Sequence, residues 1–130
     1  MSKEALTVRE LNHVALHVRD LAVSEHFYGE ILGLPRVPHP NFPFPVSWFA
    51  LGSQELHLIL VDEYRLSAPG RPATHFALRV DDAHKAYDAL IAAGVENPSK
   101  PAPRPDGPIQ VFFRDPDGHL IEMASFPDTN

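Results

Sequence analysis

An internal repeat divides the chain into two similar halves, and it constrains the fold more than any other feature of the sequence. Residues 13–20 (HVALHVRD) match residues 75–82 (HFALRVDD) at five of eight positions. Such a repeat indicates that each half is one copy of the same supersecondary motif. We therefore expect a single domain over residues 1–130, with a first module at about 9–62 and a second at about 74–126.

Each repeated segment reads as a strand followed by an amphipathic helix. The first helix is expected to begin after Asp20, a residue type that caps helix N-termini, and to end before Gly33. The second is expected to end before Gly94. The apolar residues of each predicted helix gather on one side, namely Leu21, Phe27, Tyr28, Ile31 and Leu32 in the first, and Ala83, Ala86, Tyr87, Leu90 and Ile91 in the second.

A predicted hairpin completes each half. Its strands are 46–51 and 55–61 in the first half and 109–114 and 119–125 in the second, joined by turns at 52–54 and 115–118. A further short strand is expected near Arg36 and Val37. Proline-rich loops are expected at 38–45 and 97–108, and a linker between the halves at 63–73.

Charge and composition exclude several classes of partner. The chain has 11 Lys+Arg against 17 Asp+Glu and a formal charge of −6, which disfavours nucleic acid or an anionic membrane as the main partner. It has no cysteine, so disulfides and thiolate metal ligands are excluded. No apolar run approaches the length of a membrane span, and the first residues lack the apolar core of a signal peptide. We expect a soluble, cytoplasmic domain that acts on a small molecule.

The alternation of side chains along the predicted strands places four potential metal ligands on equivalent faces. On each strand the apolar side chains that a helix must cover point one way, as Leu56 and Leu58 do. The opposite face carries one imidazole or carboxylate per strand: His13, His57, His75 and Glu122. Three imidazoles and one carboxylate suit one divalent ion of Zn, Ni, Co, Fe or Mn, because no soft thiolate is offered.

The remaining histidines are weaker candidates. A single strand histidine is often hydrogen-bonded in a polar pocket, so the metal prediction depends on the set of four. His17 shares the ligand face and is a candidate substrate contact. Solvated or capping roles are expected for His26, His39, His84 and His119.

Several motifs together resemble the vicinal oxygen chelate superfamily. They are residues 11–21 (LNHVALHVRDL), Phe27-Tyr28, Leu32-Gly33, 75–80 (HFALRV) and 115–122 (DPDGHLIE). This superfamily includes glyoxalase I, bleomycin-resistance proteins, extradiol dioxygenases, methylmalonyl-CoA epimerases and fosfomycin-modifying thiol transferases. The resemblance implies an α+β fold in which two βαβββ modules form a curled mixed sheet around a metal cleft. By motif position, His13, His75 and Glu122 match the common ligands, and His57 stands where glyoxalase-type members carry Glu or Gln.

At several positions this chain differs from the residues typical of individual activity classes of the superfamily, and these differences make those specific reactions less expected. Glutathione-dependent glyoxalase I usually has Arg and Asn where this chain has His17 and Val61. Extradiol dioxygenases usually have a Tyr where this chain has Phe112, and residues 106–109 contain no histidine. Fosfomycin-type transferases usually have a Thr at the position of Ala15 and a basic residue after the last ligand. Bleomycin-binding members usually lack the ligand set.

The resemblance therefore implies a metal-dependent, glyoxalase-like lyase or isomerase that removes a proton next to a carbonyl of a small oxygen-chelating substrate. By resemblance, Glu122 is both a ligand and the catalytic base. Trp48 and Gln110 are candidate cleft residues beside His17, with a core position as the favoured alternative for Trp48. An extradiol-type dioxygenase and a non-catalytic drug- or metabolite-binding protein are the alternatives. Exposed strand edges indicate a homodimer. The resemblance implies the same, because small glyoxalase-like members often form dimers, with each site either within one chain or shared between the two chains.

Overall fold

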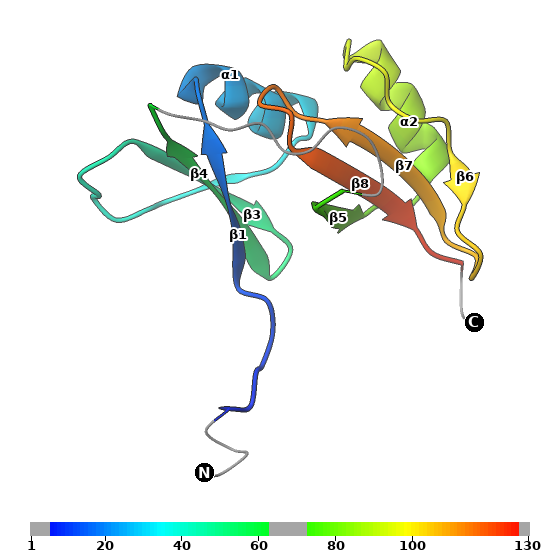
Figure 1. Ribbon diagram of the computed structural model, residues 1–130, viewed down its shortest axis with the longest axis horizontal. Helices are drawn as coiled ribbons and strands as arrows, with labels where there is room; N and C mark the ends of the chain where they lie inside the picture. Colours follow the sequence, from blue (N-terminus) through cyan, green and yellow to red (C-terminus); the bar gives the residue numbers. More distant parts are fainter. Residues whose placement is uncertain (1–5, 63–72, 128–130) are drawn as a thin grey trace. The chain divides into compact units, whose positions relative to one another are not determined.

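The computed structural model describes residues 6–62 and 73–127, and its internal contacts divide the chain into two compact units, Met1–Asp62 and Glu63–Asn130 (Figure 1). The division lies next to the end of the predicted first module. The assignment of both modules to a single domain stays a prediction. Nearly all of the predicted linker lies outside the described residues.

The first unit is a four-stranded mixed sheet in the order β1-β4-β3-β2. Its strands are β1 (His13–Val18), β2 (Arg36–Val37), β3 (Val46–Leu51) and β4 (Gln54–Leu60). β1 pairs with β4 in parallel, and β3 pairs antiparallel with both β4 and β2. The helical segment α1 (Leu21–Glu25) follows β1 and packs on β3 and β4.

The second unit repeats this topology with a sheet in the order β5-β8-β7-β6. Its strands are β5 (His75–Arg79), β6 (Ala102–Pro103), β7 (Ile109–Arg114) and β8 (Leu120–Ser125). β5 pairs with β8 in parallel, and α2 (Ala83–Ala92) packs on β7 and β8 (Figure 1). Two βαβββ modules of the α+β class are thus confirmed. The short β6 lies in a stretch predicted as loop.

The first helix differs from the prediction of one amphipathic α-helix. α1 ends at Glu25, and a π-helix, η2 (His26–Ile31), continues it, with the Leu32 amide donating to the Phe27 carbonyl at 2.9 Å. The wider turn accommodates two consecutive aromatic side chains, Phe27 and Tyr28, in buried positions. Gly29 allows this segment to approach the sheet closely, because a Cβ there would lie 3.3 Å from Cε1 of Phe49.

The sheet face beneath each helix is mainly apolar, as the alternation predicted. Leu56, Leu58 and Phe49 are fully buried in the first unit, and Val111 and Ile121 are fully buried in the second. Ile91, expected on the buried side of the second helix, is half exposed. None of the described helices has the length and apolar character needed to cross a membrane.

One polar cluster lies beneath the first helix and ties it to the short strand β2. The Arg36 guanidinium lies 2.7 Å from Oε2 of Glu25 and donates to Oγ of Ser47 at 3.3 Å. Ser47, which is fully buried, donates in turn to Glu25. The buried serine and the carboxylate therefore satisfy each other, which removes the cost of burying them unpaired.

Equivalent aspartates begin both helices. Asp20 accepts a hydrogen bond from the Val23 amide at 3.1 Å, which confirms its predicted capping role. Asp82 accepts from the amides of His84 and Lys85, at 2.9 and 3.1 Å. Both helices end before a glycine in the left-handed region, at Gly33 (φ 73°) and Gly94 (φ 83°). An aspartate cap and a glycine thus bound the helical segment of each unit, at equivalent positions of the repeat.

We predict that Asp82→Ala lowers the free energy of unfolding by about 1 kcal/mol, because it leaves two amide donors of α2 without their cap. Asp81→Ala is the matched control, since this neighbouring carboxylate is exposed and makes no capping contact with the helix. Urea denaturation followed by circular dichroism measures both. Equal stability of the two variants would contradict the capping role.

Candidate functional site

Two of the predicted metal ligands lie together in the first unit. The parallel register places Ala15 opposite His57, so His13 and His57 are diagonal neighbours on the face away from α1. Their rings stack with centroids 4.2 Å apart and an interplanar angle of 18°. His57 is buried, whereas His13 is exposed at the start of β1.

Hydrogen bonds indicate which nitrogen of each ring carries a hydrogen. Nδ1 of His13 lies 2.8 Å from Oδ1 of Asn12, and Nε2 of His57 lies 2.9 Å from Oε1 of Glu55. Amide and carboxylate oxygens can only accept, so these nitrogens are the donors. In the neutral form of each ring, Nε2 of His13 and Nδ1 of His57 are then the nitrogens with lone pairs. Glu55 shares the ligand face but was not among the predicted site residues.

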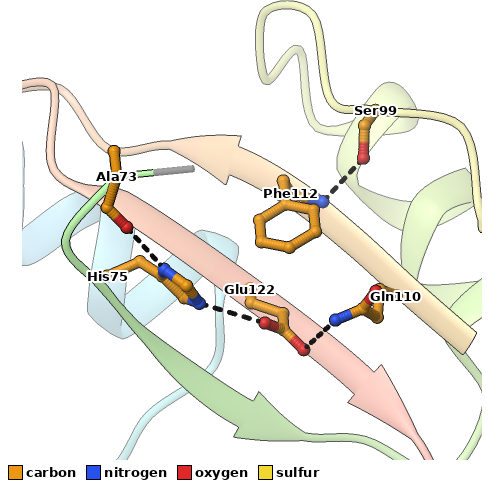
Figure 2. Close-up of polar contacts among 6 residues, drawn as sticks. All are labelled: Ala73, His75, Ser99, Gln110, Phe112 and Glu122. Atoms are coloured by element: carbon orange, nitrogen blue, oxygen red, sulfur yellow. Dashed lines mark hydrogen bonds and ion pairs between the residues drawn. The ribbon is translucent and has the colours of Figure 1, made fainter. Parts of the chain in front are cut away.

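The other two predicted ligands lie together in the second unit (Figure 2). Nε2 of His75 is 3.2 Å from Oε1 of Glu122, while Nδ1 of His75 donates to the Ala73 carbonyl at 2.7 Å. In a neutral His75 with the hydrogen on Nδ1, the Nε2 lone pair faces the carboxylate oxygen. A positive charge, either a proton or a metal cation, is needed to make this approach favourable.

Gln110 holds the second oxygen of the carboxylate. Its Nε2 donates to Oε2 of Glu122 at 3.0 Å, and the Glu122 side chain is only 6% exposed (Figure 2). Phe112, also on β7, presents its edge to His75 with ring centroids 5.6 Å apart. Ser99 accepts from the Phe112 amide at 2.8 Å. Each oxygen of the largely buried Glu122 carboxylate thus has one polar partner, His75 at Oε1 and Gln110 at Oε2.

The two units position their ligand pairs in the same way. Ala15 follows His13 by two residues and pairs with His57, and Ala77 follows His75 by two residues and pairs with Glu122. The aromatic residues Trp48 and Phe112 pair with His57 and Glu122 on the next strand of each sheet. The contact between Phe112 and His75 was not predicted from the sequence. Alignment of the two halves strand by strand would have indicated it, because Phe112 is the equivalent of Trp48.

Trp48 and His17, both predicted to line the site, lie on the ligand face of the first unit. The Trp48 ring is stacked on His57, with centroids 3.7 Å apart and an interplanar angle of 3°. Trp48 is half-buried, and His17 is exposed two residues beyond Ala15. Trp48 thus packs directly against His57, one of the predicted metal ligands.

The second unit also carries an exposed ion pair between Arg104 and Asp106, in the segment between β6 and β7. Arg104 forms a two-pronged ion pair with Asp106, at 2.5 and 2.8 Å. The hydrogen bond to Asp106 raises the pKa of Arg104 above its usual value, and the charge of Glu122 adds to this effect. The same hydrogen bond lowers the pKa of Asp106. The charge of Arg104 is thus mainly paired with that of Asp106.

Across the described ranges 6–62 and 73–127, no three His, Asp or Glu side chains converge as a metal-binding group. The four predicted ligands form two pairs, one in each unit. The histidines for which solvated or capping roles were expected lie elsewhere: His26 pairs with Glu30 at 3.4 Å, His39 contacts the Pro40 carbonyl, and His84 is exposed on α2. The His119 amide donates to Oδ1 of Asp115 within the turn.

Comparison with known proteins decides the family. The sequence profile of the Glyoxalase/Bleomycin resistance protein/Dioxygenase superfamily matches residues 10–123. The chain belongs to this superfamily. It is 33% identical over 123 residues to protein YraH of Bacillus subtilis, covering 88% of this chain and 96% of that protein. It is 28% identical over 129 residues to lactoylglutathione lyase of Escherichia coli O157:H7, covering 91% and 93%.

Solved structures confirm the glyoxalase-like fold. A glyoxalase family protein from Bacillus anthracis superposes with a TM-score of 0.79 at 25% identity, covering 93% of this chain and 98% of that chain. A mutant of the fosfomycin resistance protein FosX from Listeria monocytogenes superposes with a TM-score of 0.76 at 20% identity, covering 93% and 95%. That structure contains Mn(II) and 1S,2S-dihydroxypropylphosphonic acid.

Proposed function

We propose that His13, His57, His75 and Glu122 bind one divalent metal ion and that the chain is a metal-dependent lyase or isomerase of the glyoxalase type. The observation that carries the proposal is the contact between Nε2 of His75 and Oε1 of Glu122 at 3.2 Å, with Nδ1 of His75 already engaged by a carbonyl. Such a pair of acceptors is suited to a cation between them, and a backbone or carboxylate partner on the other nitrogen is typical of metal-bound histidines.

The donor set fits a first-row divalent ion. Each of the three imidazoles has one nitrogen engaged with an oxygen acceptor, which leaves the other nitrogen as a neutral ligand. Nitrogen and oxygen donors without sulfur suit Zn, Ni, Co, Fe or Mn. The Mn(II) in the FosX structure supports a metal of this group in the same fold.

The proposed substrate is a small molecule with two neighbouring oxygens. When bound, the metal would polarise a substrate carbonyl and stabilise negative charge on its oxygen. Glu122 would accept the proton from the adjacent carbon, because a general base must lie within hydrogen-bond reach of that proton. Gln110 keeps the carboxylate oriented through Oε2. His17 and Trp48 would line the substrate side of the first unit.

We further propose that the protein is a homodimer. Within the described strands, β1 and β2 form the edges of one sheet and β5 and β6 those of the other. Unpaired edges invite pairing, and a two-fold contact is the commonest way to cover them. The ligand pairs would then meet either within one chain or across the dimer.

For the metal site, we predict that His13→Ala, His57→Ala, His75→Ala and Glu122→Ala each lower metal affinity by more than about tenfold, because each removes one donor. His84→Ala, an exposed helix histidine, is the control and keeps full affinity. Metal content after dialysis, with Zn and Mn titrated by calorimetry, measures the effect. Full occupancy in the His13 or Glu122 variant would remove the proposed site.

For the base, we predict that Glu122→Gln retains part of the metal, since an amide oxygen can coordinate, but loses proton transfer by about 10²–10⁴-fold. The readout is exchange of solvent deuterium into substrates that this superfamily's chemistry suggests, beginning with methylglyoxal plus thiols. Exchange at an unchanged rate in this variant would rule out Glu122. Oxygen consumption with catechols would instead favour the dioxygenase alternative, and binding without turnover would favour a binding protein.

For the assembly, we predict a dimer by light scattering at micromolar concentration, and a monomer would defeat this proposal. Mixing His13→Ala and Glu122→Ala dimers tests where the ligand pairs meet. If the sites are shared across the dimer, one of the two hybrid sites keeps all four ligands, and subunit exchange restores metal binding. A dimer without such rescue places each site within one chain.

A further inference from the structure

A cluster of aromatic side chains lies next to the ligand pair of the first unit, and two of its members, Phe42 and Phe44, have no role in the proposed chemistry. We define the aromatic cluster as Phe42, Phe44 and Trp48. The Phe42 and Phe44 rings stack with centroids 5.3 Å apart, and Phe42 lies 6.0 Å from Trp48. His39 flanks Trp48 at 6.2 Å. The cluster lies entirely within one unit, so its geometry does not depend on the second.

This cluster is continuous with the proposed metal site. Trp48 stacks on His57 at 3.7 Å, and His57 stacks on His13 at 4.2 Å. A row of rings therefore leads from the proposed ligands to the loop between β2 and β3. A group attached to a chelating substrate would meet this row directly if it extended toward the loop.

The loop presents these rings at the surface. Phe42 is 39% exposed and Phe44 is 42% exposed, although both are large apolar side chains. Neither carries a charged partner in the described contacts, so the surface they form is apolar. Exposed apolar side chains that gather next to a polar site are typical of ligand-binding surfaces.

Proline restricts the backbone of this loop at each aromatic position. Residues 38–45 read PHPNFPFP, and His39, Phe42 and Phe44 each directly precede a proline. Proline biases the preceding residue toward extended conformations, and each proline ring fixes its own φ. The backbone that carries the rings therefore has less freedom to lose, which lowers the entropic cost of binding a ligand.

We propose that the aromatic cluster is a specificity site that binds a flat aromatic group of the substrate, next to the two oxygens that chelate the metal. This inference rests on the proposed function and names the substrate class for that site. Aromatic rings offer both faces and edges for offset stacking, which an aliphatic group of similar size does not exploit. The substrate class is thus an aryl compound with two vicinal oxygens.

Two matched chelators test the proposal on the metal-loaded protein. Benzohydroxamic acid and acetohydroxamic acid share the same pair of chelating oxygens, and they differ in a phenyl against a methyl group. We expect benzohydroxamate to bind about tenfold more tightly by calorimetry, because stacking adds to the chelation. Trp48 is the single tryptophan of the chain, so its emission reports binding at the cluster independently of catalysis.

Variants of the loop provide the decisive comparison. Phe42→Ala and Phe44→Ala should reduce the preference for benzohydroxamate to about twofold or less and leave acetohydroxamate affinity unchanged. Phe126→Ala is the matched control, since Phe126 has similar exposure (44%) but lies in the second unit against Arg79 and Arg104. This control should keep the full preference.

The possible outcomes separate this inference from the proposed function. Equal binding of the two chelators, or a preference that survives both loop substitutions, would overturn the aromatic site while leaving the metal site intact. Failure of both chelators to bind the wild-type protein would overturn the metal site and this inference with it. Unchanged preference combined with a lower dimer fraction in the variants would instead assign the cluster to a contact with a second copy of the chain.

Discussion

The arrangement of both units depends on the parallel pairing of the strand before the helix with the last long strand of the same unit. Parallel neighbours require a crossover, and in each unit the crossover carries the helix that covers the apolar face. The pairing also sets which side chains meet on the opposite face. It brings His13 beside His57 and His75 beside Glu122, at the same register offset in both sheets. A shift of one residue in the register of β1 or β5 would turn the histidine on that strand to the helix side.

Much of this arrangement could be predicted from the sequence because the determining signals are local. Strand alternation, with Leu56 and Leu58 facing the helix, was enough to place His57 on the other face. The repeat then supported the equivalent assignment of His75 and Glu122, and the aspartate and glycine residues marked the ends of the helices.

Other features depend on contacts that no local pattern encodes. The π-helix results from burying Phe27 and Tyr28 together against the sheet, whereas helical periodicity assumes 3.6 residues per turn. β6 has only two residues, one of them proline, so it carries too little pattern to be distinguished from a loop. The contacts of Glu122 with His75 and Gln110 join different strands, so they are visible only when the strands are in register.

The two ligand pairs differ in formal charge although the modules that hold them are alike. The first pair consists of two imidazoles, which bind a metal in their neutral form, and the second contains one carboxylate. A divalent ion held by all four residues would retain a net charge of +1 within its ligand shell. Family members with a glutamate at the position of His57 would hold the same ion at net zero. In the proposed centre, a histidine at position 57 would therefore favour substrates whose chelating oxygens are anionic.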